Sequence, residues 1–288
     1  MSGDLTVLSS MAYPGRIIII GRDPSGKRDV VVYAVTGRSP SSRARRLALE
    51  IDGTVRTEVT DPELLRGGNE QLLLYRCLRP FPGGLAVSNG AQTDLIAETA
   101  QAAAGEPAVD AQLGKPAFLP AVEILQRAFR EPHLVFGVDV TAYEPDPPAF
   151  TPRISGCLTS DAGLAIVRRL PDGGPERRYF PVPLIPGEGR LLATYAGEYR
   201  DPLPPFEGNP QEVELTGKGP QQTAEAVFEA LGPKRGPHRA TVPNVGSVRS
   251  PASSDEGPDL RVGVAVLFRD RETGRPEAAI INRTENGA

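Results

Sequence analysis

The chain has 288 residues, which is long enough to form one large domain or two. Its net charge of -4 gives no blanket positive field, so bulk nucleic-acid binding is not expected. No apolar run approaches the roughly 20 residues of a membrane span, and the N-terminus lacks the basic and apolar regions of a signal peptide. The composition therefore predicts a cytoplasmic protein with no membrane partner.

Residues 1–12 are predicted to form a loose lead-in. Residues 16–20 and 29–35 are apolar and β-branched, and the Asp23-Pro24-Ser25-Gly26 turn between them predicts a hairpin. The first of these runs contains four consecutive isoleucines, which is typical of a strand covered on both faces. The first sheet is therefore expected to lie between other layers.

Strands are predicted along most of the chain, with helices between groups of them. Helical periodicity is clear over residues 93–104, 119–129 and 221–231, and the last of these helices is expected to end at Gly232-Pro233. The regular alternation of a parallel βαβ array is missing, so the fold class is predicted to be α+β, with layers, in a single domain over residues 1–288. The other predicted strands are 47–51, 54–59, 71–78, 85–88, 137–143, 154–158, 164–169, 178–182, 191–196, 262–269 and 278–282.

Residues 232–259 are rich in proline, glycine, serine and charge and have no periodicity. They are predicted to form a mobile loop before the final hairpin, and no chemistry is assigned to them.

Cysteine and histidine are scarce. Cys77 and Cys157 lie in apolar, strand-like runs, which is typical of buried reduced thiols. His133 and His238 each follow a proline, and the sequence has no HExxH, CxxC or G-x-S-x-G motif. No metal and no cofactor are therefore expected, and the chemistry must rest on arginine, lysine, tyrosine, carboxylates and backbone groups.

A proline-rich loop over residues 143–156 joins two strand-like runs. It has four prolines in eight residues, so it should adopt few conformations. It carries Glu144, Asp146 and Arg153, and rigid charged loops at strand ends often hold binding or catalytic groups. The alternative is a solvated polar loop.

Residues 37–46 contain three serines and four arginines. Guanidinium groups bind oxyanions bidentately and hydroxyl groups add donors, so Arg38, Ser39, Arg43 and Arg45 are candidate ligands for a phosphate or carboxylate. The alternative is a solvated basic loop.

Residues 88–94 join a strand to a helix. Asn89-Gly90 can adopt positive φ and expose backbone N–H groups, so Asn89, Gln92 and Asp94 are candidate ligands for an anion or a polar ring. The alternative is a turn in which Thr93 or Asp94 caps the helix.

Tyr75 lies in an otherwise apolar run that is predicted to be a strand. A buried tyrosine with one hydrogen bond is the common case, but beside arginines it could donate a proton. Arg16 and Arg22 flank the isoleucine run and could face a cleft, but a solvated role is favoured for both.

These motifs, in this order, resemble the archaeal-type IMP cyclohydrolases and their bacterial relatives. The resemblance covers about residues 11–215 well and the C-terminal fifth weakly. It rests on Tyr13-Pro14-Gly15-Arg16, Gly21-Arg22, Gly37-Arg38-Ser39, Ser42-Arg43, Tyr75, residues 88–94, Tyr143-Glu144-Pro145-Asp146, Thr151-Pro152-Arg153-Ile154, Gly187-Glu188-Gly189, Thr194-Tyr195 and residues 204–208.

The resemblance implies a four-layer αββα sandwich of the N-terminal-nucleophile-hydrolase type, without that class's N-terminal nucleophile. It implies closure of 5-formamidoimidazole-4-carboxamide ribonucleotide to IMP, in purine biosynthesis, and a homo-oligomer. The expected catalytic residues are Arg43, Tyr75 and Glu144. The expected residues for binding a purine nucleotide are Arg38, Ser39, Arg45, Asn89, Gln92, Asp94, Asp146 and Arg153.

The chain departs from the family pattern at three positions. Ser41, Ala44 and Ala149 stand where asparagines are usual, so groups that could read a substrate are lost. Two alternatives therefore stay open. The protein could act on a different amide-type substrate in a specialised pathway, or it could be a non-catalytic nucleotide-binding module.

Overall fold

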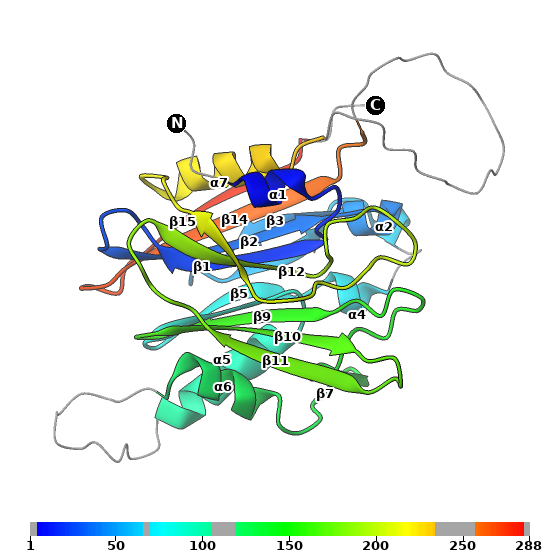
Figure 1. Cartoon of the computed structure of the whole chain (residues 1–288), viewed down its shortest axis with the longest axis horizontal. Coiled ribbons are helices and arrows are strands. Elements are labelled where there is room, and N and C mark those ends of the chain that lie inside the picture. The colour runs from blue at the N-terminus through cyan, green and yellow to red at the C-terminus, as the bar shows by residue number, and fades with distance from the viewer. Residues whose placement is uncertain (1–4, 66–68, 105–118, 234–256, 285–288) are drawn as a thin grey trace.

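The computed structural model describes residues 5–65, 69–104, 119–233 and 257–284. Within them, two antiparallel sheets pack face to face (Figure 1). The six-stranded sheet has the order β13 (Gln211–Glu214), β12 (Glu188–Ala193), β1 (Arg16–Arg22), β2 (Arg28–Thr36), β14 (Arg261–Asp270) and β15 (Pro276–Asn282).

The second sheet has seven strands and carries most of the segment between residues 45 and 181. Its order is β11 (Pro175–Pro181), β10 (Ala162–Arg169), β9 (Arg153–Leu158), β6 (Gly84–Ser88), β5 (Arg76–Phe81), β4 (Val55–Val59) and β3 (Arg45–Leu49). A separate two-stranded hairpin consists of β7 (Leu134–Val135) and β8 (Val138–Asp139).

Helices cover the outer face of each sheet (Figure 1). Helices α1 (Thr6–Ser10) and α7 (Pro220–Ala230) lie over the six-stranded sheet, and α5 (Gln92–Ala104) and α6 (Ala121–Ala128) pack on the seven-stranded sheet. The result is a layered mixed α/β protein built mostly of strands. Three short helices lie in connections: α2 (Pro40–Arg43), α3 (Pro62–Leu65) and α4 (Glu70–Leu73).

The isoleucine run of β1 is buried on both faces, as predicted. Successive side chains of a strand point to opposite faces, so Ile18 and Ile20 share the face that meets the other sheet. Ile20 packs there on Gly156 of β9, where a Cβ would lie 2.6 Å from its Cδ1. Full burial of each isoleucine contributes about 1.5–3 kcal/mol, so this strand anchors the space between the sheets.

The three predicted helices are confirmed as α5, α6 and α7. The lead-in prediction was wrong in part, because Thr6–Ser10 form α1 and bury Leu8 completely. The predicted loop 232–259 lies almost wholly outside the described residues.

Two predicted strands were wrong in ways that matter for the site. The segment before Tyr75 forms α4, because Asn69 caps it by accepting a hydrogen bond from the Gln71 N–H. The segment 137–143 is mostly turn, because Phe136 and Gly137 adopt positive φ angles of 49° and 81° and reverse the chain.

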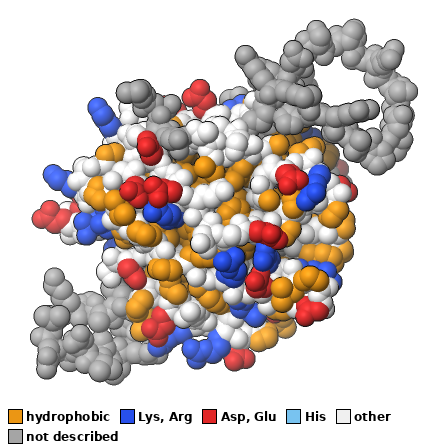
Figure 2. Space-filling model, viewed as in Figure 1, with side chains coloured by type: hydrophobic (Ala, Val, Ile, Leu, Met, Phe, Trp, Pro, Cys, Tyr) orange, Lys and Arg blue, Asp and Glu red, His pale blue; other side chains and the backbone are white. Residues whose placement is uncertain are grey.

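The surface has no continuous basic face on the side seen in Figure 2, where positive and negative side chains are interspersed. Among the described residues, no helix is long and apolar enough to cross a membrane.

Candidate active site

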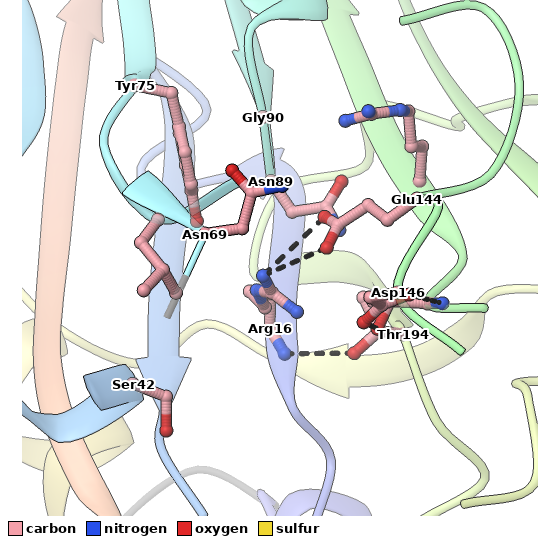
Figure 3. Close-up of polar contacts among 12 residues, drawn as sticks. Arg16, Ser42, Asn69, Tyr75, Asn89, Gly90, Glu144, Asp146 and Thr194 are labelled. Atoms are coloured by element: carbon pink, nitrogen blue, oxygen red, sulfur yellow. Dashed lines mark hydrogen bonds and ion pairs between the residues drawn. The ribbon is translucent and has the colours of Figure 1, made fainter. Parts of the chain in front are cut away.

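Polar side chains from both sheets meet between the sheets, at the end where β1 begins (Figure 3). We call these residues the central polar cluster: Arg16, Tyr33, Tyr75, Asn89 and Glu144. All five are buried, and burial of polar groups costs free energy unless each finds partners. Such a concentration of buried ionisable groups is typical of a functional site.

Arg16 and Glu144 form a buried ion pair at the centre of the cluster. The Nη2 atom of Arg16 lies 3.4 Å from Oε2 and 3.5 Å from Oε1 of Glu144. These contacts are longer than the about 2.7–2.9 Å of a close charge-assisted bond. The Nε of Arg16 is buried with no hydrogen-bond partner among the described residues. Both groups therefore keep hydrogen-bonding capacity for a ligand.

The start of β1 is held in place by β12. The backbone N–H of Arg16 donates to Oγ1 of Thr194 at 3.0 Å, and that hydroxyl donates to the carbonyl of Pro14 at 3.1 Å. Gly15 has a φ of +78°, and a Cβ there would lie 2.1 Å from Thr194 Oγ1. Only glycine fits this turn, which aims Arg16 into the cluster.

Asn89 connects Glu144 to the seven-stranded sheet. Its Nδ2 donates to the carbonyl of Pro152 at 2.9 Å and lies 3.5 Å from Oε1 of Glu144. Its Oδ1 accepts from the backbone N–H of Ile154 at 2.9 Å and from Gln92 Nε2 at 3.0 Å. The Asn89 amide is thus fully used within the protein, and it positions the carboxylate.

Arg153 fixes the loop that carries Glu144. Its Nε donates to the carbonyl of Ala142 at 2.8 Å, and its Nη1 donates to Oε1 of Gln92 at 3.1 Å. A Cβ on Gly90 would lie 2.5 Å from Nη1, so the close approach needs glycine. Arg153 and Gln92 therefore position the loop, and their predicted role as substrate ligands stays a prediction.

Asp146 closes the same loop on itself. Its carboxylate accepts from the backbone N–H of Thr151 at 2.7 Å and from Thr151 Oγ1 at 2.5 Å. The Tyr195 hydroxyl lies 2.7 Å from the same Oγ1. Asp146 therefore positions Glu144 through the loop backbone, and the substrate contact predicted for it stays a prediction.

Tyr33 and Tyr75 bring phenols from opposite sheets together, with 2.7 Å between their hydroxyl oxygens. Burial raises the pKa of Tyr33 well above its ordinary value, and the neighbouring Tyr75 raises it further. Tyr33 therefore stays protonated. The Tyr75 backbone N–H donates to Oγ1 of Thr57 at 2.9 Å, which fixes where its ring enters the cluster.

Burial raises the pKa of Glu144, and the positive charges of Arg16 and Arg153 oppose that rise. Burial alone would lower the pKa of Arg16, but Glu144 and the two phenols hold it well above its ordinary value. Arg16 therefore stays charged, and Glu144 is the member of the pair whose protonation state changes with pH.

This direction of shift predicts a slope in stability with pH. Above an unfolded-state pKa of about 4.3, the unfolded chain has lost the proton that the folded protein still holds on Glu144. The free energy of unfolding of the wild type should therefore fall, relative to Glu144→Gln, as pH rises from about 4.3 through the folded-state pKa. Urea denaturation of both proteins at several pH values measures this; parallel curves would contradict the raised pKa.

Of the residues that the sequence singled out, the structure brings Tyr75, Asn89, Gln92, Glu144 and Arg153 together. Arg45 is also buried nearby, since its charge lowers the pKa of Glu144 against the effect of burial. Its Nε and Nη1 donate to the carbonyls of Ser42 and Leu73, each at 3.0 Å. Arg45 therefore braces the turns around Tyr75.

Arg38 lies at the margin of the cluster. Its side chain is partly exposed and contacts Asp201 at 3.4 Å. Burial raises the pKa of Tyr13, and the charges of Arg16, Arg38 and Arg45 oppose that rise, so all three lie around this tyrosine.

Three predicted site residues do not join the cluster. Arg43 ends α2 and lines cavities beside Thr60 and Arg283, away from the partners predicted for it. Ser39 is exposed and caps α2 by accepting from the Ser42 N–H. Asp94 pairs with Arg76 at 3.0 Å and Arg79 at 2.9 Å beside α5.

Tyr33 is the member that sequence reasoning missed. For Arg16 a cleft-facing position was considered and a solvated role was favoured, yet it is buried. The signal for a buried Arg16 was its position two residues before Ile18, because strand alternation puts Arg16 and Ile18 on the same, inner face of the sheet. Tyr33 pairs with Ile18 across the hairpin and therefore points the same way.

The two cysteines fit their prediction. Cys77 and Cys157 are buried free thiols, and burial raises the pKa of each far above its ordinary value. Among the described residues, no three histidine, cysteine, aspartate or glutamate side chains gather as a metal site.

Comparison with known proteins gives a family match over part of the chain. The model of a family described as IMP cyclohydrolase-like protein matches residues 13–114, which carry Arg16, Tyr33, Tyr75 and Asn89. The chain is thus IMP cyclohydrolase-like over this part of its length. This confirms the resemblance for the motifs within residues 13–114 and supports a hydrolase-type enzyme, whereas Glu144 and the later motifs lie outside the match.

The other comparisons add little. No curated protein matches the chain. A solved structure of Anbu from Hyphomicrobium sp. strain MC1 is similar at 10% identity, with 92% of this chain and 87% of that chain covered, but its TM-score is only 0.29. That similarity is too weak to support an argument.

Proposed function

We propose that the protein closes 5-formamidoimidazole-4-carboxamide ribonucleotide to IMP, with loss of water. The observation that carries the proposal is the buried Arg16–Glu144 pair beside the Tyr33–Tyr75 phenols. Arg16 and both phenols lie in the segment that the IMP cyclohydrolase-like family matches.

The reaction needs donors at the formyl oxygen. The carboxamide nitrogen, a poor nucleophile, attacks the formyl carbon, and negative charge develops on the formyl oxygen. Each fixed donor aimed at such an oxyanion is worth about 2.7–4 kcal/mol. We assign this role to Arg16, whose Nε has no described partner, and to the Tyr75 hydroxyl. Arg16 thus replaces Arg43, which lines a different cavity.

Proton transfers complete the reaction. Glu144 accepts a hydrogen bond from the carboxamide N–H and orients the nitrogen towards the formyl carbon. The attacking nitrogen loses one proton, which neutralises the oxyanion and gives the carbinolamine. The carbinolamine hydroxyl then leaves as water with a proton from Tyr75, and the adjacent ring nitrogen returns its proton to the Tyr75 phenolate. The hydroxyl oxygens of Tyr33 and Tyr75 lie 2.7 Å apart. Tyr33 therefore hydrogen-bonds to the Tyr75 oxygen while Tyr75 gives up its proton.

The substrate's phosphate needs a cation at the edge of this site. Arg38 is the candidate, because its side chain is partly exposed and has only a 3.4 Å contact with Asp201. Arg45 is not the candidate, because it is buried and already donates to two backbone carbonyls. On this reading the nucleotide lies with its base in the cluster and its phosphate near Arg38.

The direct test is an assay of IMP formation, followed by the ultraviolet change that accompanies ring closure. Purified protein should convert the formamido substrate to IMP without added metal or cofactor. No conversion over a wide range of enzyme concentration would reject the proposal.

Replacing Tyr75 with phenylalanine should lower kcat by about 10²-fold, because the proton donor is lost while the ring still packs. The KM should change little, since the donor acts in the transition state. Steady-state kinetics of the wild type and of Tyr75→Phe measure both constants. Tyr33→Phe is the matched control, because it removes the partner hydroxyl but leaves Tyr75 in place, so its loss should be much smaller. Unchanged turnover of Tyr75→Phe would remove this tyrosine from the mechanism.

A second candidate is a related enzyme that acts on a different amide-type substrate in a specialised pathway. It is favoured by Ser41, Ala44 and Ala149, which replace usual asparagines. Ala44 is buried, so an added amide there would need space that its neighbours fill. A panel of amide and ureido compounds in the same assay separates this candidate from the first. Nucleotide-induced stabilisation without turnover would favour a third reading, a non-catalytic nucleotide-binding module.

The remaining inferences follow from the resemblance. We infer a single domain over residues 1–288 with the αββα layering of N-terminal-nucleophile hydrolases, working in the cytoplasm as a homo-oligomer. Sedimentation analysis tests the oligomer.

A further inference from the structure

A cavity of about 540 Å³ lies where the ends of β3, β4 and β15 meet, outside the central polar cluster. It is bounded by Arg43, Arg45, Arg46, Val59, Thr60, Asn282 and Arg283. A larger cavity of about 1030 Å³ adjoins it and shares Arg43, Thr60, Asn282 and Arg283. Neither lining contains Arg16, Tyr75, Asn89 or Glu144.

The Asn282 side chain fixes the walls of this cavity, because it forms hydrogen bonds from the six-stranded sheet to the seven-stranded sheet. Asn282 Oδ1 accepts from the Leu47 N–H at 2.8 Å, and its Nδ2 donates to the Leu47 carbonyl at 2.9 Å. The amide occupies the free backbone groups at the middle of edge strand β3. Arg45 and Arg46 on β3 and Arg283 after β15 are therefore held at fixed positions relative to one another.

Positive charge in the cavity exceeds what its neighbours neutralise. Four arginines line it, and no carboxylate does. Arg46 is paired with Glu58 at 2.9 Å, and Arg45 donates to two backbone carbonyls. The side chains of Arg43 and Arg283 have no described hydrogen bond or ion pair.

The nearest acidic groups in the adjoining cavity are already engaged. Asp259 is bound by Arg261 at 2.7 Å. Asp61 accepts from the backbone N–H groups of Glu63 and Leu64. Burial acts to raise the pKa of Asp259, but its hydrogen bonds to Arg261 and the charges of Arg261 and Arg283 lower it, and the carboxylate is bound directly by Arg261. Among the described residues, Arg43 and Arg283 therefore share a cavity with no carboxylate bound directly to either guanidinium.

We propose that this cavity is a second binding site, for a small molecule that carries a diphosphate group. Each guanidinium offers a planar fork that matches two phosphate oxygens, and the Thr60 hydroxyl adds a donor. The volume suits a ligand of nucleotide size, and a mostly polar, cationic lining disfavours an apolar one. Free pyrophosphate and a nucleoside diphosphate share this chemistry.

The test is isothermal titration of the full chain with inorganic pyrophosphate and, separately, with adenosine diphosphate. Wild-type protein should bind one equivalent, and Arg43→Gln and Arg283→Gln should each raise the Kd about tenfold or more, because each removes charge-assisted bonds. Both side chains are half-buried with no described partner, so the variants should fold; unchanged melting temperatures without ligand check this. Tighter binding of adenosine diphosphate would identify a nucleotide ligand, and equal binding would identify the diphosphate group alone.

Two controls separate this site from others. Arg200→Gln removes an exposed arginine that pairs with Glu198, and it should leave the Kd unchanged. Arg38→Gln should also leave it unchanged, because Arg38 is the phosphate ligand proposed for the central polar cluster. Absence of binding at millimolar ligand, or equal losses in Arg43→Gln and Arg200→Gln, would overturn the proposal. Loss of binding in Arg38→Gln would do the same. None of these readouts depends on turnover, so the result stands apart from the proposed function.

Discussion

Replacing Glu144 with alanine should lower the free energy of unfolding by about 3–5 kcal/mol, because Arg16 is left as a buried charge without its partner. The same change should reduce kcat for IMP formation by about 10²–10⁴-fold, since the group that orients the carboxamide is lost. The carboxylate is almost fully buried and lies against Arg16 and Asn89, so no exposed neighbour can replace it. Urea denaturation measures the free energy of unfolding, and the spectrophotometric assay measures kcat.

Glu144→Gln separates these two effects. Glutamine keeps the shape and an acceptor for Arg16 and Asn89, so more stability should be retained than in the alanine variant, while activity stays low. Glu58→Gln is the surface control, because that carboxylate pairs with the exposed side chains of Arg46 on β3 and Arg56 on β4. If Glu144→Ala kept wild-type turnover, the pair would be structural only.

Much of the fold could be predicted from patterns that act locally. The isoleucine run predicted a strand buried on both faces because backbone alternation leaves no other place for four apolar side chains. The three long helices were predicted because their periodicity reports the face that packs on a sheet. The element before Tyr75 was mistaken for a strand because its apolar leucines fit either period, and the deciding signal was the Asn69 cap.

The site was predictable where a residue's neighbours in sequence determine its direction. Glu144 and Asn89 were found because a stiff loop and a strand-to-helix turn hold them. The structure places Arg43 at the end of α2, where it lines a different cavity, whereas Arg45 begins β3 and is buried. The sequence could not show where α2 ends and β3 begins, so it could not show which arginine points inwards. Tyr33 was missed because its partner Tyr75 comes from the other sheet, a contact that no local pattern reports.

A second large effect is expected when both members of the buried pair are made apolar. Removing one partner leaves an uncompensated charge, but replacing both with side chains of similar volume is often neutral or stabilising by about 1–4 kcal/mol. The double variant Arg16→Met/Glu144→Leu should therefore be more stable than Glu144→Ala and close to the wild type. Chemical denaturation measures this, and the two single variants complete the cycle.

The same double variant should have no measurable cyclohydrolase activity, because it keeps the fold but lacks the donor and the acceptor that the reaction needs. A matched control lies at the other end of the same hairpin, where Arg22 and Asp29 form an ion pair at 3.0 Å. Arg22→Met/Asp29→Leu removes a comparable pair from the same two strands and should keep wild-type kcat. Equal loss of activity in both double variants would mean that the hairpin needs charge for its structure. Loss confined to the Arg16 and Glu144 double variant would locate the chemistry at the start of β1, since only there does an ion pair meet the two phenols.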